Sequence, residues 1–236
     1  MSRHGFGGLV TDEQWRRLVH AAVPRTFATG DTVLRQGEPG AGVHLMVSGR
    51  AKVVLLRADG SRVPLAFRAC GEMLGESVLA GAQHPRSATV TALCPSTTAF
   101  LTAARFQRLL SDLDLQSALV RSFLMRQHEG DSIRARQSAL PAELRLPAVL
   151  LHLASVVGEP IPEPASEHGR RTARGCLLAI SLAQHEIAEF AGMSRTSVHN
   201  AYTGLRERGI IRTGRQYVAI LDLDALEALV EERQDM

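Results

Sequence analysis

The spacing of hydrophobic and polar positions changes along the chain, and the first stretch has the spacing of a helix. Thr11 to Gln14 has the composition of a capping box, in which the first and last residues satisfy each other's backbone N–H groups. Apolar residues then recur at helical spacing as far as Ala22. We expect a helix that ends at Pro24, because proline cannot continue the helical hydrogen bonds.

From Thr26 to Thr102 the helical spacing is lost, and short β-rich runs alternate with glycine, proline and aspartate. Short strands at regular intervals predict a small barrel or jelly roll. Asp59-Gly60, between two of the runs, is a hairpin signal. The predicted strands are 32–34, 43–48, 51–56, 62–67, 88–92 and 97–101.

Helical spacing returns at Ala103, first as a short helix and then as a long one over about 113–140. The apolar stripe of the long helix needs a partner, and a parallel coiled-coil seam with a second copy of the chain is the expected one. Gly130 falls within this helix and is a hinge, a ligand contact or a tolerated surface glycine. The predicted stripe is Leu115, Ala118, Leu119, Ser122, Met125 and Ile133.

The C-terminal part begins with an apolar helix over 144–157, a proline-rich loop over 158–169 and a short strand over 176–180. A helix, a glycine-containing turn and a second helix follow, which is the layout of a helix-turn-helix. Ser181 is expected to open the first helix, Gly192 to end it and Ser194 to cap the second, which runs to Arg208. Two short strands, 210–212 and 216–220, predict a β-hairpin wing.

The outward positions of the second helix are polar and can bond base edges or phosphates. Ser194 to Arg215 holds five arginines and one glutamate, whereas Asp222 to Asp235 holds six acids and one arginine. A basic island in an acidic domain indicates contact with a polyanion, although a solvated helix face has the same composition. The predicted DNA-binding residues are Ser194, Arg195, Thr196, Ser197, His199 and Asn200.

Overall composition narrows the class of protein without changing these predictions. The three cysteines are scattered, so neither a disulfide framework nor a cysteine-ligated metal site is expected. No apolar run has membrane-spanning length and the N-terminus lacks the pattern of a signal peptide, so we expect a cytoplasmic protein with no membrane partner. No nucleophile–base pair, phosphate loop or metal-ligand cluster stands out, so we expect no enzyme, no catalytic residues and no required cofactor.

The stretch from Gly71 to Ala92 carries the most specific candidate chemistry. It holds a Gly75-Glu76 pair and, ten residues after the glutamate, Arg86 followed by Ser87. An arginine can balance the charge of a phosphate, a serine and backbone N–H groups can bond its oxygens, and a carboxylate can accept from sugar hydroxyls. The alternative is the charged rim of a hairpin.

Taken together, these motifs resemble those of the Crp–Fnr superfamily of bacterial regulators. The resemblance covers nearly the whole chain, including the glycine-rich turn 37–40, the interval of ten from Glu76 to Arg86, the long helix and the stretch 182–211. It implies an α+β fold: a β-barrel effector domain over 1–112, a dimerisation helix over 113–140 and a winged helix-turn-helix over 141–236.

The resemblance also implies roles for individual residues. Its expected ligand is a cyclic nucleotide, cAMP or cGMP, with the ribose held by Gly75 and Glu76 and the cyclic phosphate by Arg86 and Ser87. The full set of predicted ligand residues is Gly75, Glu76, Ser77, Arg86, Ser87, Arg126 and Asp131.

Two departures from the family pattern affect specificity. The threonine–serine pair that contacts adenine in the family is replaced by Gly130-Asp131, or by Asp131-Ser132 in the alternative register. In the recognition helix Arg195 matches the arginine of the family, but Thr196 and Asn200 replace the family's glutamate and second arginine. We therefore expect an operator sequence that differs from the one read by that family pattern.

The sequence thus predicts a homodimeric transcription regulator that binds a palindromic operator under the control of a cyclic nucleotide, with RNA polymerase as a further partner. One alternative is a regulator of the same fold that needs no effector or responds to another one, such as haem. A second is a cyclic-nucleotide-binding module that docks protein, which the acidic C-terminal stretch favours.

Overall fold

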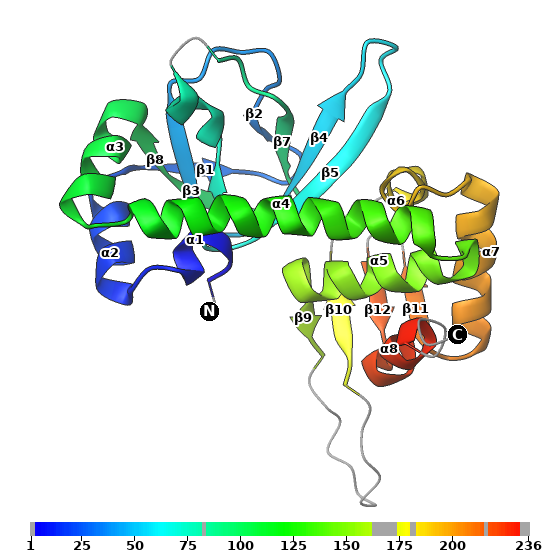
Figure 1. The fold of residues 1–236 in the computed structure, drawn as a ribbon. Coiled ribbons are helices and arrows are strands. Elements are labelled where there is room, and N and C mark those ends of the chain that lie inside the picture. The colour runs from blue at the N-terminus through cyan, green and yellow to red at the C-terminus, as the bar shows by residue number, and fades with distance from the viewer. Residues whose placement is uncertain (1–2, 82–83, 162–173, 180–182, 215–216, 232–236) are drawn as a thin grey trace, which may run out of the picture. The chain divides into compact units, whose positions relative to one another are not determined.

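The computed structural model describes residues 3–81, 84–161, 174–179, 183–214 and 217–231, and its helices and strands are labelled in Figure 1. The chain divides into two compact units, Met1–Ser132 and Ile133–Met236. Helix α4 (Gln116–Ala139) contributes residues to both units and continues unbroken through Gly130. Each unit has its own hydrophobic core.

The N-terminal unit consists of two short sheets with helices at their side. Besides α4, its elements are α1 (Gly5–Gly8), α2 (Asp12–His20), β1 (Val23–Phe27), β2 (Thr32–Leu34), β3 (Gly42–Ser48), β4 (Ala51–Leu56), β5 (Arg62–Arg68), β6 (Met73–Leu74), the 3-10 turn η1 (Glu76–Ala80), β7 (Thr89–Ala92), β8 (Ser96–Thr102) and α3 (Ala103–Asp112).

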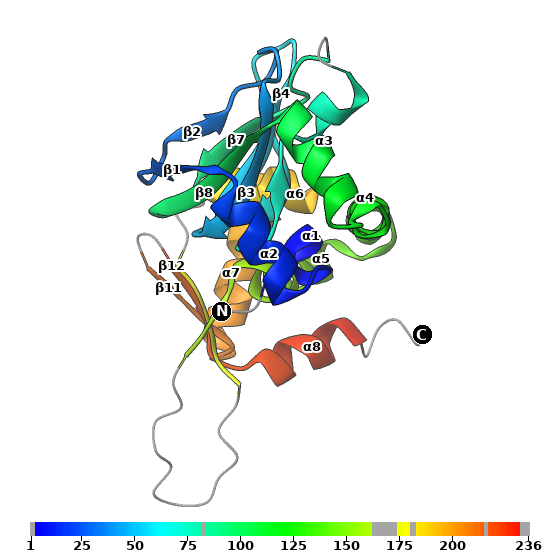
Figure 2. The same cartoon turned by 90° about the vertical axis from the view of Figure 1, so that its left-hand side faces the viewer.

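The strands form two antiparallel sheets, in the orders β1-β8-β3-β6 and β2-β7-β4-β5. Side chains from both sheets, Met46 and Leu74 from one and Ala51 and Val90 from the other, meet in one buried cluster. The sheets therefore enclose a shared interior, as expected for a barrel or jelly roll. Figure 2, which looks along α4, shows α1, α2 and α3 gathered on one side of the strands.

Most of the strands predicted from the sequence are present, and β2 and β4 have the expected bounds. β1 is a correction: Pro24 does not end a helix but lies in an edge strand, paired with Ala99 of β8. An edge position suits proline, which has no N–H to donate to a neighbouring strand. The capping box at the start of α2 is confirmed, since Thr11 N–H donates to Gln14 Oε1 over 2.9 Å and Gln14 N–H to Thr11 Oγ1 over 3.2 Å.

The apolar stripe of α4 is also placed differently from the prediction. Leu115, Ala118 and Leu119 pack into the core of their own unit, and Ser122 is buried as well, so this face already has a partner within the chain. Met125, expected on the same stripe, is exposed. A second apolar face remains exposed, with these exposed fractions: Val120 55%, Phe123 37%, Leu124 59% and Met125 52%.

The C-terminal unit is a helix-turn-helix with a small sheet. Its elements after α4 are α5 (Ala142–Val157), β9 (Glu159–Pro160), β10 (Cys176–Leu178), α6 (Gln184–Ala191), α7 (Arg195–Glu207), β11 (Ile211–Gly214), β12 (Tyr217–Ile220) and α8 (Leu223–Glu231). The strands form one antiparallel sheet in the order β11-β12-β10-β9.

Helix α8 corrects the view of the C-terminus as a simple acidic stretch. Leu226 is fully buried, and Val230 packs against Leu140, Leu144 and Ala148. Asp224 and Glu231 of α8 are exposed and Glu227 is half-buried, so the helix is amphipathic and is part of the folded unit. Most of the proline-rich loop predicted over 158–169 lies outside the described residues, as do Ile180 and Gln216 from the predicted strands.

Candidate functional site

A hollow opens in the N-terminal unit where the stretch 75–88 meets α4. It holds about 470 Å³ of space between side chains, counting the part open to solvent. Leu34, Val53, Leu74 and Val90 form an apolar wall. The polar lining comes from Arg68, Gly75, Glu76, Ser77, Arg86, Ser87 and Arg126.

Gly75 provides the sharp turn between β6 and η1 that begins this lining. Its φ is +82°, in the left-handed region that favours glycine. A Cβ atom at this position would clash with Nη1 of Arg86. Glycine is therefore required both for the turn and for the close approach of the arginine.

Arg86 is a buried cation held only by backbone carbonyls. It is 6% exposed, and its guanidinium donates from Nη1 to the carbonyl oxygen of Gly75 and from Nη2 to that of Gly42, the latter over 2.6 Å. Its backbone is fixed by Arg86 N–H donating to Glu38 O over 2.9 Å. Burial lowers the pKa of Arg86, and the nearby charge of Glu76 opposes that shift. Within the described part of the chain, no carboxylate forms an ion pair with Arg86, so the site suits an anion.

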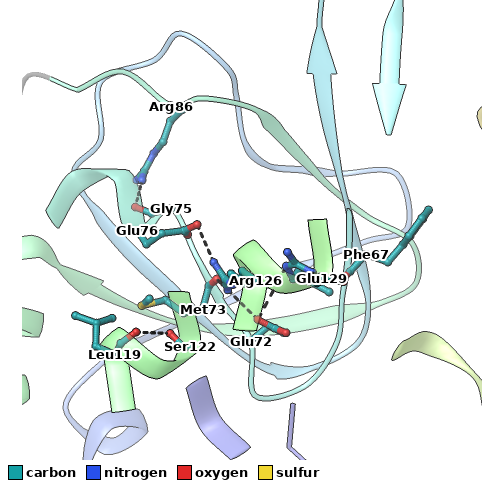
Figure 3. A network of polar contacts seen from close by, with 11 residues as sticks. Phe67, Glu72, Met73, Gly75, Glu76, Arg86, Leu119, Ser122, Arg126 and Glu129 are labelled. Carbon is teal, nitrogen blue, oxygen red and sulfur yellow. Dashed lines mark hydrogen bonds and ion pairs between the residues drawn. The ribbon is translucent and has the colours of Figure 1, made fainter. Parts of the chain in front are cut away.

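Arg126 of α4 bridges two acids of the barrel (Figure 3). Its Nη1 lies 2.7 Å from Oε1 of Glu76 and its Nη2 lies 2.8 Å from Oε2 of Glu72, and Nη2 also donates to Met73 O. Burial alone lowers the pKa of Arg126, but the charges of Glu76 and Glu72 outweigh it and raise the pKa. The carboxylate expected to bind a sugar hydroxyl is therefore also bonded to the long helix.

A second ion pair joins β5 to α4 beside the first. Nη1 of Arg68 lies 2.9 Å from Oε2 and 3.2 Å from Oε1 of Glu129, and Nε of Arg68 lies 4.0 Å from Oε2 of Glu72. Arg68, Glu72 and Glu129 were not predicted from the sequence. The signal available was that Arg68 and Glu72 flank a run of small and apolar residues, where a buried charge needs a partner of opposite sign.

The structure brings together most of the predicted ligand residues. Gly75, Glu76, Ser77, Arg86, Ser87 and Arg126 all line the pocket. Asp131 is exposed on α4 and is not part of the pocket lining.

In the C-terminal unit, α6, a turn at Gly192 and α7 form the predicted helix-turn-helix. Gly192 ends α6 with a φ of +62°, and Ser194 caps α7 by accepting from Ser197 N–H over 3.0 Å. Val198 and Tyr202 are the buried side of α7. Burial raises the pKa of Tyr202, so its hydroxyl is a neutral member of this core.

The opposite side of α7 is polar and exposed. It carries Arg195, Thr196, His199 and Asn200, with Ser194 at the cap, whereas Ser197 is half-buried. Farther along, Nη2 of Arg206 donates to Thr203 Oγ1 over 2.9 Å and Nη1 to Thr213 Oγ1 of the wing over 3.4 Å. This side can donate to and accept from nucleic-acid bases and phosphates.

The start of α6 differs from the prediction. The helix begins at Gln184, and Glu186 Oε2 accepts from Ala183 N–H over 3.1 Å, so Ala183 is the residue before the first turn. Ser181 and Leu182, with which the helix was expected to open, lie outside the described residues. The side chain that accepts from Ala183 N–H thus comes from inside the helix.

Two protein families match the two units. The cyclic nucleotide-binding domain family matches residues 24–112, and the Crp-like helix-turn-helix domain family matches residues 144–229. The first match covers nearly all of the strands of the first unit and its pocket lining except Arg126, and the second covers the helix-turn-helix. No described helix is both long and apolar enough to span a membrane.

Curated relatives and solved structures resemble the chain over most of its length. A "CRP-like cAMP-activated global transcriptional regulator" of Mycobacterium tuberculosis is 26% identical over 206 residues, which cover 86% of each chain. A "Cyclic AMP receptor protein" of Thermus thermophilus is 26% identical over 206 residues, which cover 87% of each. The crystal structure of a CRP-family transcriptional regulator of Thermus thermophilus superposes with a TM-score of 0.69 at 23% identity, covering 87% of this chain and 96% of that one.

Proposed function

This chain belongs to the Crp–Fnr superfamily of DNA-binding transcription regulators, and on that premise we propose that it is a homodimer whose DNA affinity is set by a cyclic nucleotide. The family match assigns it to regulators rather than enzymes. Effector control, dimerisation, the operator and RNA polymerase as a partner are parts of the proposal, as is a cytoplasmic location.

The observation that carries the effector proposal is the state of Arg86. Among the described residues that line the pocket or pair with its lining, three are arginines and three are glutamates. Arg126 and Arg68 are matched by Glu72, Glu76 and Glu129, whereas Arg86 bonds only neutral carbonyls. A buried cation whose own hydrogen bonds end on neutral carbonyls suits an anionic ligand group such as a cyclic phosphodiester.

The neighbouring groups match the rest of a cyclic nucleotide. Ser87 lies beside Arg86 in the pocket lining and can donate to a phosphate oxygen, and Glu76 can accept from a ribose hydroxyl. The apolar wall of Leu34, Val53 and Val90 can cover a sugar and a base. The relatives named for cyclic AMP support the class of ligand.

Arg126 connects the proposed ribose contact at Glu76 to helix α4. A ribose hydroxyl on Glu76 competes with or adds to the bond between Glu76 and Arg126 of α4, so ligand binding and the position of α4 are coupled. An effector that changes DNA affinity 100-fold through this coupling supplies about 2.7 kcal/mol, within the usual range of coupling energies.

The exposed apolar face of α4 supports the dimer. Val120, Phe123 and Leu124 recur at helical spacing and are 55%, 37% and 59% exposed, respectively. Because a soluble protein rarely leaves such a face uncovered, we assign it to a parallel seam with a second copy. Two copies of α7 then contact two half-sites of a palindrome about one DNA turn apart, roughly 34 Å.

Calorimetric titration of the purified chain with cAMP and cGMP tests the effector. We expect at least one to bind, and binding of either to raise the affinity for a palindromic DNA fragment. If neither binds at millimolar concentration while circular dichroism shows an intact fold, the cyclic-nucleotide proposal is wrong. DNA binding without any nucleotide then indicates an effector-independent regulator, and an absorbance band after adding haem indicates the haem alternative.

A further inference from the structure

Arg68 is a buried arginine of the pocket that takes part in neither the phosphate contact nor the ribose contact proposed above. It is the last residue of β5 and only 8% exposed, yet it is part of the pocket lining. Its Nη1 donates to Phe67 O over 2.8 Å and to Glu129 Oε2 over 2.9 Å. These bonds hold the guanidinium in one orientation.

The other terminal nitrogen of Arg68 makes no such bond. Every hydrogen bond of this side chain leaves from Nη1, and Nε is 4.0 Å from Glu72 Oε2. Within the described ranges of the chain, Nη2 has no hydrogen-bond acceptor. Because Arg68 lines the pocket, this donor is available to a ligand atom that accepts.

The order of groups along the pocket indicates that the ligand atom facing Arg68 belongs to the base of the nucleotide. In Figure 3, Glu76 lies between Arg86 on one side and Glu129, the partner of Arg68, on the other. A cyclic nucleotide with its phosphate on Arg86 and its ribose on Glu76 therefore extends its base toward Arg68. Arg126, the other cation at this end, is already bonded to Glu72 and Glu76.

The chemistry of the two purines decides which base fits. A guanidinium offers only donors. Guanine presents two adjacent acceptors on its Hoogsteen edge, O6 and N7, whereas adenine presents N7 beside an amino group that is itself a donor. Arginine therefore bonds guanine at two points and faces a donor on adenine.

We propose that Arg68, oriented by Glu129, selects guanine at the base end of the pocket, so that the effector is cyclic GMP. This inference rests on the cyclic-nucleotide function proposed above. Arg68 is the specificity-determining residue, and Glu129 is a positioning residue that acts through it. The same contact links the base to α4, since Glu129 belongs to that helix.

Titration of the full chain with four nucleotides, cGMP, cIMP, 7-deaza-cGMP and cAMP, tests the inference without any mutation. Cyclic IMP keeps O6 and N7, so we expect it to bind with cGMP-like affinity. Cyclic AMP should bind about tenfold or more weakly, as for other bidentate arginine–guanine contacts. Seven-deaza-cGMP, which lacks N7, should fall between them.

Variants separate the role of Arg68 from its part in the fold. Arg68→Met keeps the apolar stem of the side chain and should bring the ratio of cGMP to cAMP affinity close to one. If this variant does not fold, Arg68→Lys keeps a positive charge beside Glu72 and Glu129. The lysine variant should also lose most of the preference, because an ammonium cannot bond two acceptors in the planar geometry of a guanidinium. Glu129→Gln should lower the affinity ratio while cAMP affinity stays within about twofold. Arg62→Met, an exposed arginine on the same strand, is the matched control and should leave the ratio unchanged.

The outcomes distinguish this inference from the function on which it rests. If the unmodified chain binds cAMP as tightly as cGMP, or binds cIMP like cAMP, the inference is wrong and the cyclic-nucleotide function stands. If Arg68→Lys keeps the full preference, Arg68 does not read the base. If no nucleotide binds to the folded chain, both proposals are wrong.

Discussion

Nη1 of Arg126 lies 2.7 Å from Oε1 of Glu76, so a residue of the long helix is bonded to the carboxylate expected to accept from the ligand's sugar. The Arg126 side chain is 15% exposed and that of Glu76 is 34% exposed, whereas Glu72, the second partner, is 9% exposed. The pair therefore ties α4 to the barrel at the point where a ligand would bind.

Arg126→Gln should destabilise the N-terminal unit by about 3 kcal/mol, because it removes the close ion pair of the buried carboxylate of Glu72 and leaves only Arg68 Nε at 4.0 Å. Urea unfolding measures the change. Arg121→Gln, an exposed position on the same helix, is the control and should change stability by less than about 0.5 kcal/mol. Equal stability of the two variants would show that the bridge contributes nothing.

Gly75→Ala should reduce the affinity for a cyclic nucleotide by more than about tenfold, because the new Cβ displaces Nη1 of Arg86. The same change also places alanine at a positive φ, which costs about 1–2 kcal/mol by itself. Gly60→Ala separates the two effects, since Gly60 has a φ of +81° and nothing within 4 Å of its Cβ position. Calorimetry should show normal affinity for Gly60→Ala, and equal losses in both variants would contradict the proposed contact.

His44 should make the protein less stable in acid. Burial, followed by the charges of Arg86 and Arg25, lowers the pKa of His44 to about 4 from 6.5. Its ring is buried, and Nδ1 is 2.9 Å from Oγ1 of Thr98. Because the unfolded chain binds the proton more tightly than the folded one, the stabilisation is complete above pH 6.5 and is lost as the pH falls toward 4.

The full loss should be about 3 kcal/mol, as follows from a shift of this size. Urea unfolding at several pH values measures it. His44→Gln should flatten the dependence between pH 6.5 and 4, whereas His20→Gln, at an exposed position, should not. An unchanged slope in His44→Gln would assign the acid lability to other groups.

Leu124→Glu should convert the proposed dimer to monomers, because it puts a charge into the apolar face of α4. Light scattering coupled to size-exclusion chromatography measures the mass. Arg108→Glu, an exposed position on α3, introduces the same residue outside the face and should leave the dimer intact. A monomeric unmodified chain would remove the basis for a two-fold operator.

Arg195→Ala should weaken binding to a specific operator by about 1–3 kcal/mol and relax the base preference at one position of each half-site. Arg195 is exposed at the start of α7, where it can reach a base edge. Gel-shift titrations at several salt concentrations measure affinity and specificity together. Arg57→Ala, an exposed arginine of the N-terminal unit, is the control. If Arg195→Ala leaves DNA binding unchanged while the fold is intact, the polar side of α7 has another role, such as protein docking.

Elements with local signals could be predicted from the sequence. The capping box at Thr11 and Gln14, the hairpin at Gly60 and the cap at Ser194 depend on residues within a few positions of each other. The same holds for the alternating apolar residues of the strands, because neighbours along the chain determine which face they share.

The sequence also predicted the part of the candidate site proposed for the sugar and the phosphate, since Gly75, Glu76, Arg86 and Ser87 lie in one short stretch. Only the tertiary structure decided the other half. Arg126 reaches Glu72, and Glu129 reaches Arg68, across 54 and 61 positions, and no local pattern relates such residues.

On α4, too, the sequence predicts the helix, whereas the tertiary structure decides which of its faces is buried. Periodicity predicts that Ala118 and Leu124 both lie on a long helix, but it cannot tell which apolar residues its own chain will cover. Packing against the barrel buries Ala118 and leaves Leu124 exposed. Burial depends on the volume available next to the helix, and that volume is set by strands far away in the sequence.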